Sequence, residues 1–180
     1  MSTQRLPGSF FTDDVLVVAP QLPGKYLVMN NSSHPEKYVI TEVEAYRGEE
    51  DLACHASNGR TRRNEIMYAD GGHVYVYLIY GIYWMLNFVT GKTGNPQAVL
   101  IRCLEGYDGP GKLTRKLGID GSYYGEDLGS SGRIWVEDNH IKAKITSCPR
   151  IGIDYAGNIW KSKPWRFILD VKSHSPNGKL

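Results

Sequence analysis

The sequence predicts an α+β fold with mostly antiparallel strands, and three observations support this prediction. The chain has 180 residues, the size of one ordinary domain, so we expect residues 1–180 to form a single compact unit with a flexible polar tail at about 173–180. Hydrophobic residues make up 41% of the chain and charged residues 22%, a balance that excludes a disordered chain. Short runs rich in Val, Ile, Tyr and Trp alternate with turns rich in Gly, Asn and Pro, which is typical of hairpins.

The first half of the chain is expected to form two hairpins on either side of a polar loop. Tyr26–Met29 and Tyr38–Val43 are β-rich runs with Asn, Ser and Pro between them, so we expect them to pair through a long connection. Arg47–Tyr68 is polar and loop-like. His73–Thr90 is dense in Val, Ile, Tyr and Trp, and Gly81 divides it into two strands that meet there.

The second half is expected to add further strands and one helix. Ala98–Leu104 reads as a short strand, and Lys112–Leu117 as a short helix that follows a Gly-Pro-Gly turn. Gly132–Glu137 and Ile141–Ile145 are expected to pair as a hairpin, because Asp and Asn separate them. Trp165–Val171 is expected to be a strand that closes the domain.

The cysteine content indicates a protein of a reducing compartment. The three cysteines form no CxxC pair, so a disulfide scaffold is not expected. The longest apolar run near the N-terminus, Val15–Pro20, is too short for a signal peptide or a membrane span, so we expect a cytoplasmic or nucleoid-associated protein, nuclear in a eukaryote.

Residues 1–110 carry 9 Lys and Arg against 12 Asp and Glu, a net charge of −3, whereas residues 111–180 carry 12 against 7, a net charge of +5. A basic C-terminal part suits a polyanionic partner, and a solvated surface explains it equally well.

Two acidic residues, Glu42 and Glu44, are the first candidates for chemistry. They are two residues apart in a strand-like run, so we expect their side chains on the same face. Val39, Ile40 and Val43 lie around them, and burial of that face would raise a carboxyl pKa and suit a general base. The alternative is a solvent-facing pair on an amphipathic strand, which is the commoner situation for charged residues.

Metal-ligating and basic residues give weaker signals. The Cys and His residues show no metal-ligand spacing, so no metal site is expected, and His55 fits a hydrogen-bonding role in a loop. Arg60, Arg62 and Arg63 form a cluster that could neutralise phosphates, and a solvated loop explains the cluster equally well. The glycine-rich turn before Lys112 lacks the Ser or Thr of a P-loop, although a turn that opens a helix can still offer N–H groups to a phosphate.

Tyrosine is the most distinctive feature of the composition, with 12 residues in the chain. Tyr75, Tyr77, Tyr80 and Tyr83 fall within one hairpin-like run. Tyr77 and Tyr80 differ in parity, so one can line a pocket while the other projects from the turn. Aromatic rings stack on nucleobases, which would suit such positions, whereas we expect Tyr75 and Tyr83 in the core.

Several motifs follow one another along almost the whole chain. They are Glu42-Val-Glu44-Ala-Tyr46, His55, Arg63-Asn64, Tyr75-Val-Tyr77-Leu-Ile-Tyr80-Gly81-Ile-Tyr83, Asn87, Leu100-Ile-Arg102, Gly109-Pro-Gly-Lys-Leu113 and Arg150-Ile-Gly-Ile153. In this order they resemble the alkyladenine (3-methyladenine, or methylpurine) DNA glycosylase family. The resemblance implies one compact domain around a curved antiparallel sheet, with a β-hairpin that enters the minor groove of double-stranded DNA.

The activity that the resemblance implies is the removal of damaged purines from DNA. A monomeric, monofunctional enzyme with no metal or cofactor would flip the nucleotide out of the duplex and hydrolyse the N-glycosidic bond, which starts base excision repair. Typical substrates of the family are 3-methyladenine, 7-methylguanine, hypoxanthine and ethenoadenine.

The resemblance also implies roles for individual residues. Glu44 would be the general base that activates the attacking water, and Arg102 would help to hold that water together with the backbone carbonyl of Ile153. Tyr80 would fill the gap that the flipped nucleotide leaves. Tyr46, His55 and Tyr77 would clamp the base, Asn87 would reject the 2-amino group of guanine, and Arg63 and Asn64 would shape the pocket or the DNA surface. Separately from the resemblance, the basic cluster and the glycine-rich turn make Arg60, Arg62, Arg63 and Lys112 candidates for phosphate contacts.

Two departures from animal members and two alternative functions remain open. Arg62 stands where animal members have proline, and its charge would either strengthen phosphate contact or only change a loop. Asp154-Tyr155 also differs, which bears on the pocket geometry and so on lesion preference. The alternatives are a module that binds damaged DNA without cutting it and a nucleosidase that acts on small N-glycosides. Base release separates an enzyme from the first, and a steep salt dependence of affinity separates a DNA enzyme from the second.

Overall fold

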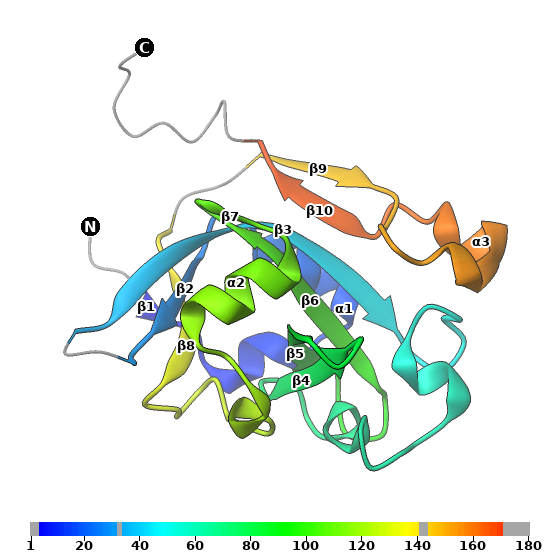
Figure 1. Cartoon of the computed structure of the whole chain (residues 1–180), viewed down its shortest axis with the longest axis horizontal. Coiled ribbons are helices and arrows are strands. Elements are labelled where there is room, and N and C mark those ends of the chain that lie inside the picture. Colours follow the sequence, from blue (N-terminus) through cyan, green and yellow to red (C-terminus); the bar gives the residue numbers. More distant parts are fainter. Residues whose placement is uncertain (1–3, 32–33, 141–143, 171–180) are drawn as a thin grey trace.

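The strands of the protein join into one curled antiparallel sheet. The computed structural model describes residues 4–31, 34–140 and 144–170. Within these residues the strand order is β1-β8-β2-β3-β6-β5-β4, with β7 attached to β6, and β10 attached to both β3 and β9 (Figure 1). The strands are β1 (Gln4–Arg5), β2 (Tyr26–Met29), β3 (Glu36–Arg47), β4 (Val74–Ile79), β5 (Tyr83–Thr90), β6 (Gln97–Leu104), β7 (Tyr107–Asp108), β8 (Ile134–Asp138), β9 (Ile145–Cys148) and β10 (Arg166–Leu169).

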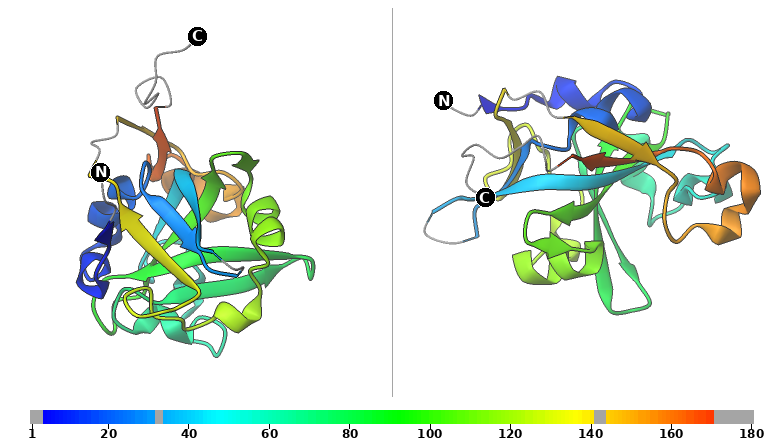
Figure 2. Two further views of the ribbon diagram at one scale, coloured as in Figure 1. Left: turned by 90° about the vertical axis from the view of Figure 1, so that its left-hand side faces the viewer. Right: turned by 90° about the horizontal axis from the view of Figure 1, so that it is seen from above.

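Short helices cover the sheet, so the predicted α+β class is confirmed. α1 and α2 lie on opposite sides of β3 (Figure 2) and contribute Val15, Val18, Leu113 and Leu117 to the main core. No described helix combines the length and the apolarity that a membrane crossing requires. The helices are α1 (Val15–Val18), α2 (Pro110–Leu117) and α3 (Gly157–Lys161), with 3-10 turns η1 (Gly8–Phe11), η2 (Ala19–Gln21), η3 (His55–Asn58), η4 (Glu65–Tyr68), η5 (Gly121–Tyr123) and η6 (Asp154–Ala156).

Strand β3 runs through the middle of the sheet, and its pairing with β6 is irregular at Glu42. The register shifts on both sides of Glu42, and Ile40 and Val43 both pack in the main core although they are three residues apart. After this irregularity the alternation is regular. Val43 and Ala45 point into the core, and Glu44 and Tyr46 therefore face the opposite side of the strand.

The β4–β5 hairpin projects from the body of the molecule (Figure 2). At its tip Tyr80 has φ 54° and Gly81 has φ 68°, and the Ile82 N–H donates to the Ile79 carbonyl at 3.1 Å. Positive φ at both central residues matches the twist of the flanking strands, but it strains a non-glycine residue by about 1–2 kcal/mol. The turn leaves 85% of Tyr80 exposed, and the predicted division of this run at Gly81 is confirmed.

Most of the other predicted elements are confirmed in outline. β2 and β3 pair as a hairpin, with Tyr26 opposite Val39. The predicted Lys112–Leu117 helix is α2, which begins earlier because a proline at the first helical position is compatible with a helix start. The predicted Ala98–Leu104 strand is part of β6.

Two expectations are wrong. Gly132–Glu137 does not pair with Ile141–Ile145: β8 has β1 along one edge and β2 along the other, and β9 pairs with β10. Residues 141–143, Val171 and the 173–180 tail lie outside the described residues. Tyr83 is not a core residue, because it is 37% exposed and its ring lies against α2.

Gly71 offers a test of this packing. A Cβ at this position would overlap the backbone of Phe11, and neither backbone segment can move easily because the Gly71 N–H is bonded to the Gly91 carbonyl and the Gly91 N–H to the Phe11 carbonyl. We expect Gly71→Ala to reduce the free energy of unfolding by about 1–3 kcal/mol through overpacking. Gly132→Ala is the matched control, since nothing lies within 4 Å of its added Cβ. Equal thermal unfolding midpoints for the two variants would contradict the packing described.

Candidate active site

A cavity of about 440 Å³ opens between β3, β6, the β4–β5 hairpin and the segment that contains residues 151–155. Its wall is mainly aromatic and apolar, with a small number of polar side chains, as in most small-molecule sites. The aromatic residues of the wall are Tyr46, His55, Tyr75, Tyr77, Tyr80 and Tyr155. Their elements are far apart in sequence, and the curl of the sheet brings them together.

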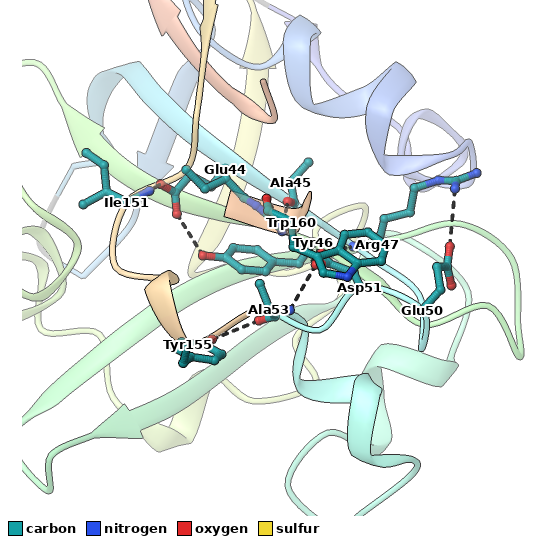
Figure 3. A network of polar contacts seen from close by, with 11 residues as sticks. Glu44, Ala45, Tyr46, Arg47, Glu50, Asp51, Ala53, Ile151, Tyr155 and Trp160 are labelled. Atoms are coloured by element: carbon teal, nitrogen blue, oxygen red, sulfur yellow. Dashed lines mark hydrogen bonds and ion pairs between the residues drawn. The ribbon is translucent and has the colours of Figure 1, made fainter. Parts of the chain in front are cut away.

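The Glu44 carboxyl group lies behind this wall and is completely buried. Its Oε2 accepts a hydrogen bond from the Tyr46 hydroxyl at 2.8 Å, and its Oε1 accepts one from the Ile151 backbone N–H at 2.7 Å (Figure 3). Arg102 Nη1 lies 3.4 Å from the same Oε1. Donors from three separate segments therefore converge on one carboxyl group.

The environment of Glu44 has opposing effects on its pKa. Burial raises the pKa above its usual value, while the Arg102 charge, the Ile151 N–H and the Tyr46 hydroxyl oppose that rise. The net direction is upward, so the carboxylate is a stronger base than an exposed one. The alternative of a solvent-facing acid is therefore wrong for Glu44.

Arg102 links Glu44 to Glu42. Arg102 Nε donates to Glu42 Oε1 at 2.8 Å, and Arg166 of β10 donates to the same oxygen from Nη1 at 3.2 Å. Both glutamates therefore form ion pairs with Arg102, which confirms that they share a face of β3. Arg102 is only 15% exposed and lines the cavity, so a charged donor stands beside Glu44 at the floor of the site.

Aromatic rings pack against one another around the cavity, His55 and Tyr77 edge to face and Tyr75 and Tyr77 in a tilted arrangement. The His55 and Tyr77 ring centroids are 4.4 Å apart with an interplanar angle of 72°, and Tyr75 and Tyr77 are 5.4 Å apart at 36°. Tyr75 is 1% exposed, as expected for a core position, and it also lines the cavity. The structure therefore brings Tyr46, His55 and Tyr77 together around one space, although their roles toward a base stay predictions.

His55 is held in one tautomer by its neighbours. Arg63 can only donate, so His55 Nε2, 3.1 Å from Arg63 Nη2, must be the acceptor. The proton of the neutral ring is then on Nδ1, which donates to the Tyr75 hydroxyl oxygen at 2.8 Å. Burial and the Arg63 charge lower the His55 pKa to about 4, so the ring is neutral near neutral pH.

Two further predicted residues also line the cavity. Asn87 is 3% exposed, and its Nδ2 donates to the carbonyl oxygens of Tyr75 and Met85, at 3.2 Å each, so Oδ1 is left to act as an acceptor. Ile153 is 3% exposed, and its carbonyl oxygen accepts the Ala156 N–H at 3.0 Å. The group of this segment that reaches Glu44 is the Ile151 N–H, which sequence reasoning did not identify.

The remaining predicted residues lie at the rim or outside the cavity. Tyr80 is at its mouth, and Arg63 stacks over the Tyr77 ring at 5.0 Å. Arg60 is paired with the Glu65 carboxylate, and Arg62 lines a second, open groove on the other face of the hairpin. Lys112 lies on the exposed face of α2.

Asn64 supports the loop rather than the cavity. Its side chain is 1% exposed, with Nδ2 donating to the carbonyl oxygens of His55 and Gly59 and Oδ1 accepting the Thr61 N–H. The side chain thereby fixes η3, the turn that carries His55. Among the described residues, no group of three His, Cys, Asp or Glu side chains is arranged to hold a metal ion.

Comparison with known proteins identifies relatives along most of the sequence. The model of the methylpurine-DNA glycosylase (MPG) family matches residues 9–108 and 105–173. The chain is 44% identical to a protein of Methanocella arvoryzae over 182 residues, covering 90% of each, and 41% identical to one of Legionella pneumophila strain Corby over 174 residues, covering 92% of this chain and 94% of the other. Both carry the name "Putative 3-methyladenine DNA glycosylase".

The state of His55 can be measured directly. Because its pKa is about 4, we expect the ring to stay neutral, with the proton on Nδ1, from pH 8 down to about pH 5. In Arg63→Gln the lost positive charge should move the pKa upward, and the tautomer should no longer be fixed because an amide can accept as well as donate, whereas Tyr75→Phe should leave the proton on Nδ1. Nitrogen-15 NMR of the imidazole reports both properties. A His55 that titrates near 6.5 in the unmodified protein would refute this description.

Proposed function

Because the chain belongs to the methylpurine-DNA glycosylase family, and so is an N-glycosyl hydrolase that acts on DNA, we propose that it excises alkylated and deaminated purines from duplex DNA. The substrate class would include 3-methyladenine, 7-methylguanine, hypoxanthine and ethenoadenine, and excision would start base excision repair. The observation that carries the proposal is the wholly buried Glu44 carboxyl, which lies behind an aromatic cavity and is held by Arg102, Tyr46 and the Ile151 N–H, three residues that line that cavity.

The first step is extrusion of the damaged nucleotide. A base inside a duplex cannot reach an enclosed cavity, so it must leave the stack, at a cost of a few kcal/mol. Tyr80 projects from the hairpin tip at the mouth of the cavity, where its ring can fill the space that the base vacates. The flipped purine then lies between Tyr77 and His55 on one side and Tyr46 on the other.

The second step is hydrolysis of the glycosidic bond. Glu44 takes a proton from a water molecule, the water oxygen forms a bond to the anomeric carbon, and the bond to the purine nitrogen breaks with its electron pair going to the base. This is the general-base arrangement of inverting glycoside hydrolysis. A cationic alkylated purine leaves as a neutral base, whereas a neutral purine leaves more slowly unless it gains a proton.

Glu44→Gln tests the reaction. Glutamine keeps the size of the side chain and cannot accept the proton, so we expect the single-turnover rate of base release to fall by at least about 10²–10⁴-fold. Affinity for lesion duplex should stay close to that of the unmodified protein. The measurement is a base-release assay on a panel of duplexes, each with one modified purine. Near-normal release by Glu44→Gln would remove Glu44 as the base, and no release by the unmodified protein would favour a binding module.

Tyr80→Ala tests the extrusion step. Loss of the ring should slow the single-turnover excision of a base from duplex DNA much more than excision from single strands, because only the duplex requires a filled stack. Tyr80→Phe is the matched control: it keeps the ring and the same backbone conformation at a positive φ, and it should retain most of the duplex rate. If Tyr80→Ala excises from duplex as fast as Tyr80→Phe, the wedge role is wrong.

A further inference from the structure

The ion pair between Asp51 and Arg150 lies beside the site, and the reaction proposed above does not use it. Both side chains are completely buried, and neither is among the described residues that line the cavity. Arg150 binds both carboxylate oxygens, with Nη1 2.6 Å from Oδ2 and Nη2 2.9 Å from Oδ1. Because two charges are costly to remove from water, an internal pair of this kind is a weak source of stability, and its presence calls for another explanation.

The pair also binds the backbone of the segments that surround the site. The carboxylate accepts two N–H groups from the end of β3 and the loop after it, and the guanidinium donates to carbonyl groups of β3 and α3. The carboxylate partners are the N–H groups of Arg47 and Ala53, each at 3.1 Å, and the guanidinium partners are the carbonyl oxygens of Ala45 at 2.9 Å and Trp160 at 3.4 Å.

Two hydrogen-bond donors of Glu44 belong to residues that are linked to Arg150, one through the chain and the other through a ring contact. Ile151, whose N–H binds Glu44 Oε1, is the residue after Arg150. Tyr46, whose hydroxyl binds Oε2, has its ring 4.9 Å from the Arg150 guanidinium carbon. The remaining donor, Arg102, comes from β6 and is held independently by Glu42.

We propose that the Asp51–Arg150 pair is a positioning device that holds the Ile151 N–H and the Tyr46 hydroxyl on the Glu44 carboxylate. This inference rests on the proposed role of Glu44 as the base. A functional group must be held to within about 0.5 Å of its productive geometry by groups that are themselves fixed, and a bidentate pair with four backbone partners is such a support. Asp51 and Arg150 are therefore positioning residues and touch no substrate.

The pair should also influence the ionisation of Glu44. The Arg150 charge and the two hydrogen bonds all oppose the rise in the Glu44 pKa that burial causes. Replacing the pair removes the Asp51 charge together with the Arg150 charge, so the further rise that we expect in this pKa comes from the loss of the two hydrogen bonds. The base works in its ionised form, and the acid limb of the pH–rate profile would then move to higher pH. The groups that face or influence Glu44 are Arg102, Arg150, Tyr46, Tyr77 and Tyr155, with Glu42 and Arg166 next to Arg102.

The test replaces both partners at once, so that no charge is left buried alone. In Asp51→Leu with Arg150→Met, we expect the single-turnover rate, on the lesion that the unmodified protein releases fastest, to fall by about 10–100-fold, as for other supporting residues of a site. The acid limb should move to higher pH, affinity for lesion duplex should stay unchanged, and the Ile151 amide should exchange its hydrogen faster. The control is Lys25→Met with Asp138→Asn, which removes a pair 2.9 Å apart between the start of β2 and β8 and should change none of these.

Each outcome decides the question. A folded double variant with an unchanged rate and acid limb overturns the proposal, as does one that only unfolds at a lower temperature. If the double variant does not fold, the single-turnover rate of Arg150→Lys is measured instead, because lysine keeps the charge but cannot bind both oxygens in a fork. A fall in that rate supports the proposal, and an unchanged rate overturns it. If the unmodified protein releases no base, or Glu44→Gln stays active, the proposed function fails and the positioning role with it. A base-releasing protein with an unaffected variant refutes the positioning role alone.

Discussion

The arrangement of the site depends on one buried carboxyl group and the donors that make its burial tolerable. A wholly buried, unpartnered carboxylate would be neutral, because the charged form cannot be stabilised without water. The hydroxyl of Tyr46, the N–H of Ile151 and the guanidinium of Arg102 replace that water around Glu44. They come from β3, from the segment after β9 and from β6, so the site exists only when these three parts of the chain are assembled.

The floor and the mouth of the cavity differ in how firmly their residues are held. Its floor is rigid, since Glu44 and Arg102 are on neighbouring central strands of the sheet and hold each other through charge. Its mouth is formed by the projecting hairpin, where Tyr80 keeps a strained backbone and exposes its ring. Under the proposed function, the chemistry that needs fixed distances lies in the sheet, and contact with DNA lies on a protruding turn.

The sequence predicted well what adjacent segments determine. The β2–β3 and β4–β5 hairpins follow from local patterns, and Glu44 and Tyr77 follow from motifs that lie within those strands. β8 was paired wrongly because its true neighbours, β1 and β2, are more than a hundred residues away in the chain, where local spacing carries no information. Sequence reasoning missed the Ile151 N–H because every residue except proline carries a backbone N–H, so the sequence does not single this one out. It missed Asp51 because an acidic residue in a polar loop is expected to be solvated.

The irregular pairing of β3 with β6 has a consequence for how this gene can change. From Ile40 to Val43 the chain advances three residues while β6 advances three from Leu104 to Ile101, so the two register shifts around Glu42 cancel. An in-frame loss of one codon between Ile40 and Val43 would leave two residues opposite three, and the pairs from Val43–Ile101 to Arg47–Gln97 could not form together with Ile40–Leu104. Such a deletion would separate the Glu44 carboxyl from the Arg102 guanidinium although neither residue is lost.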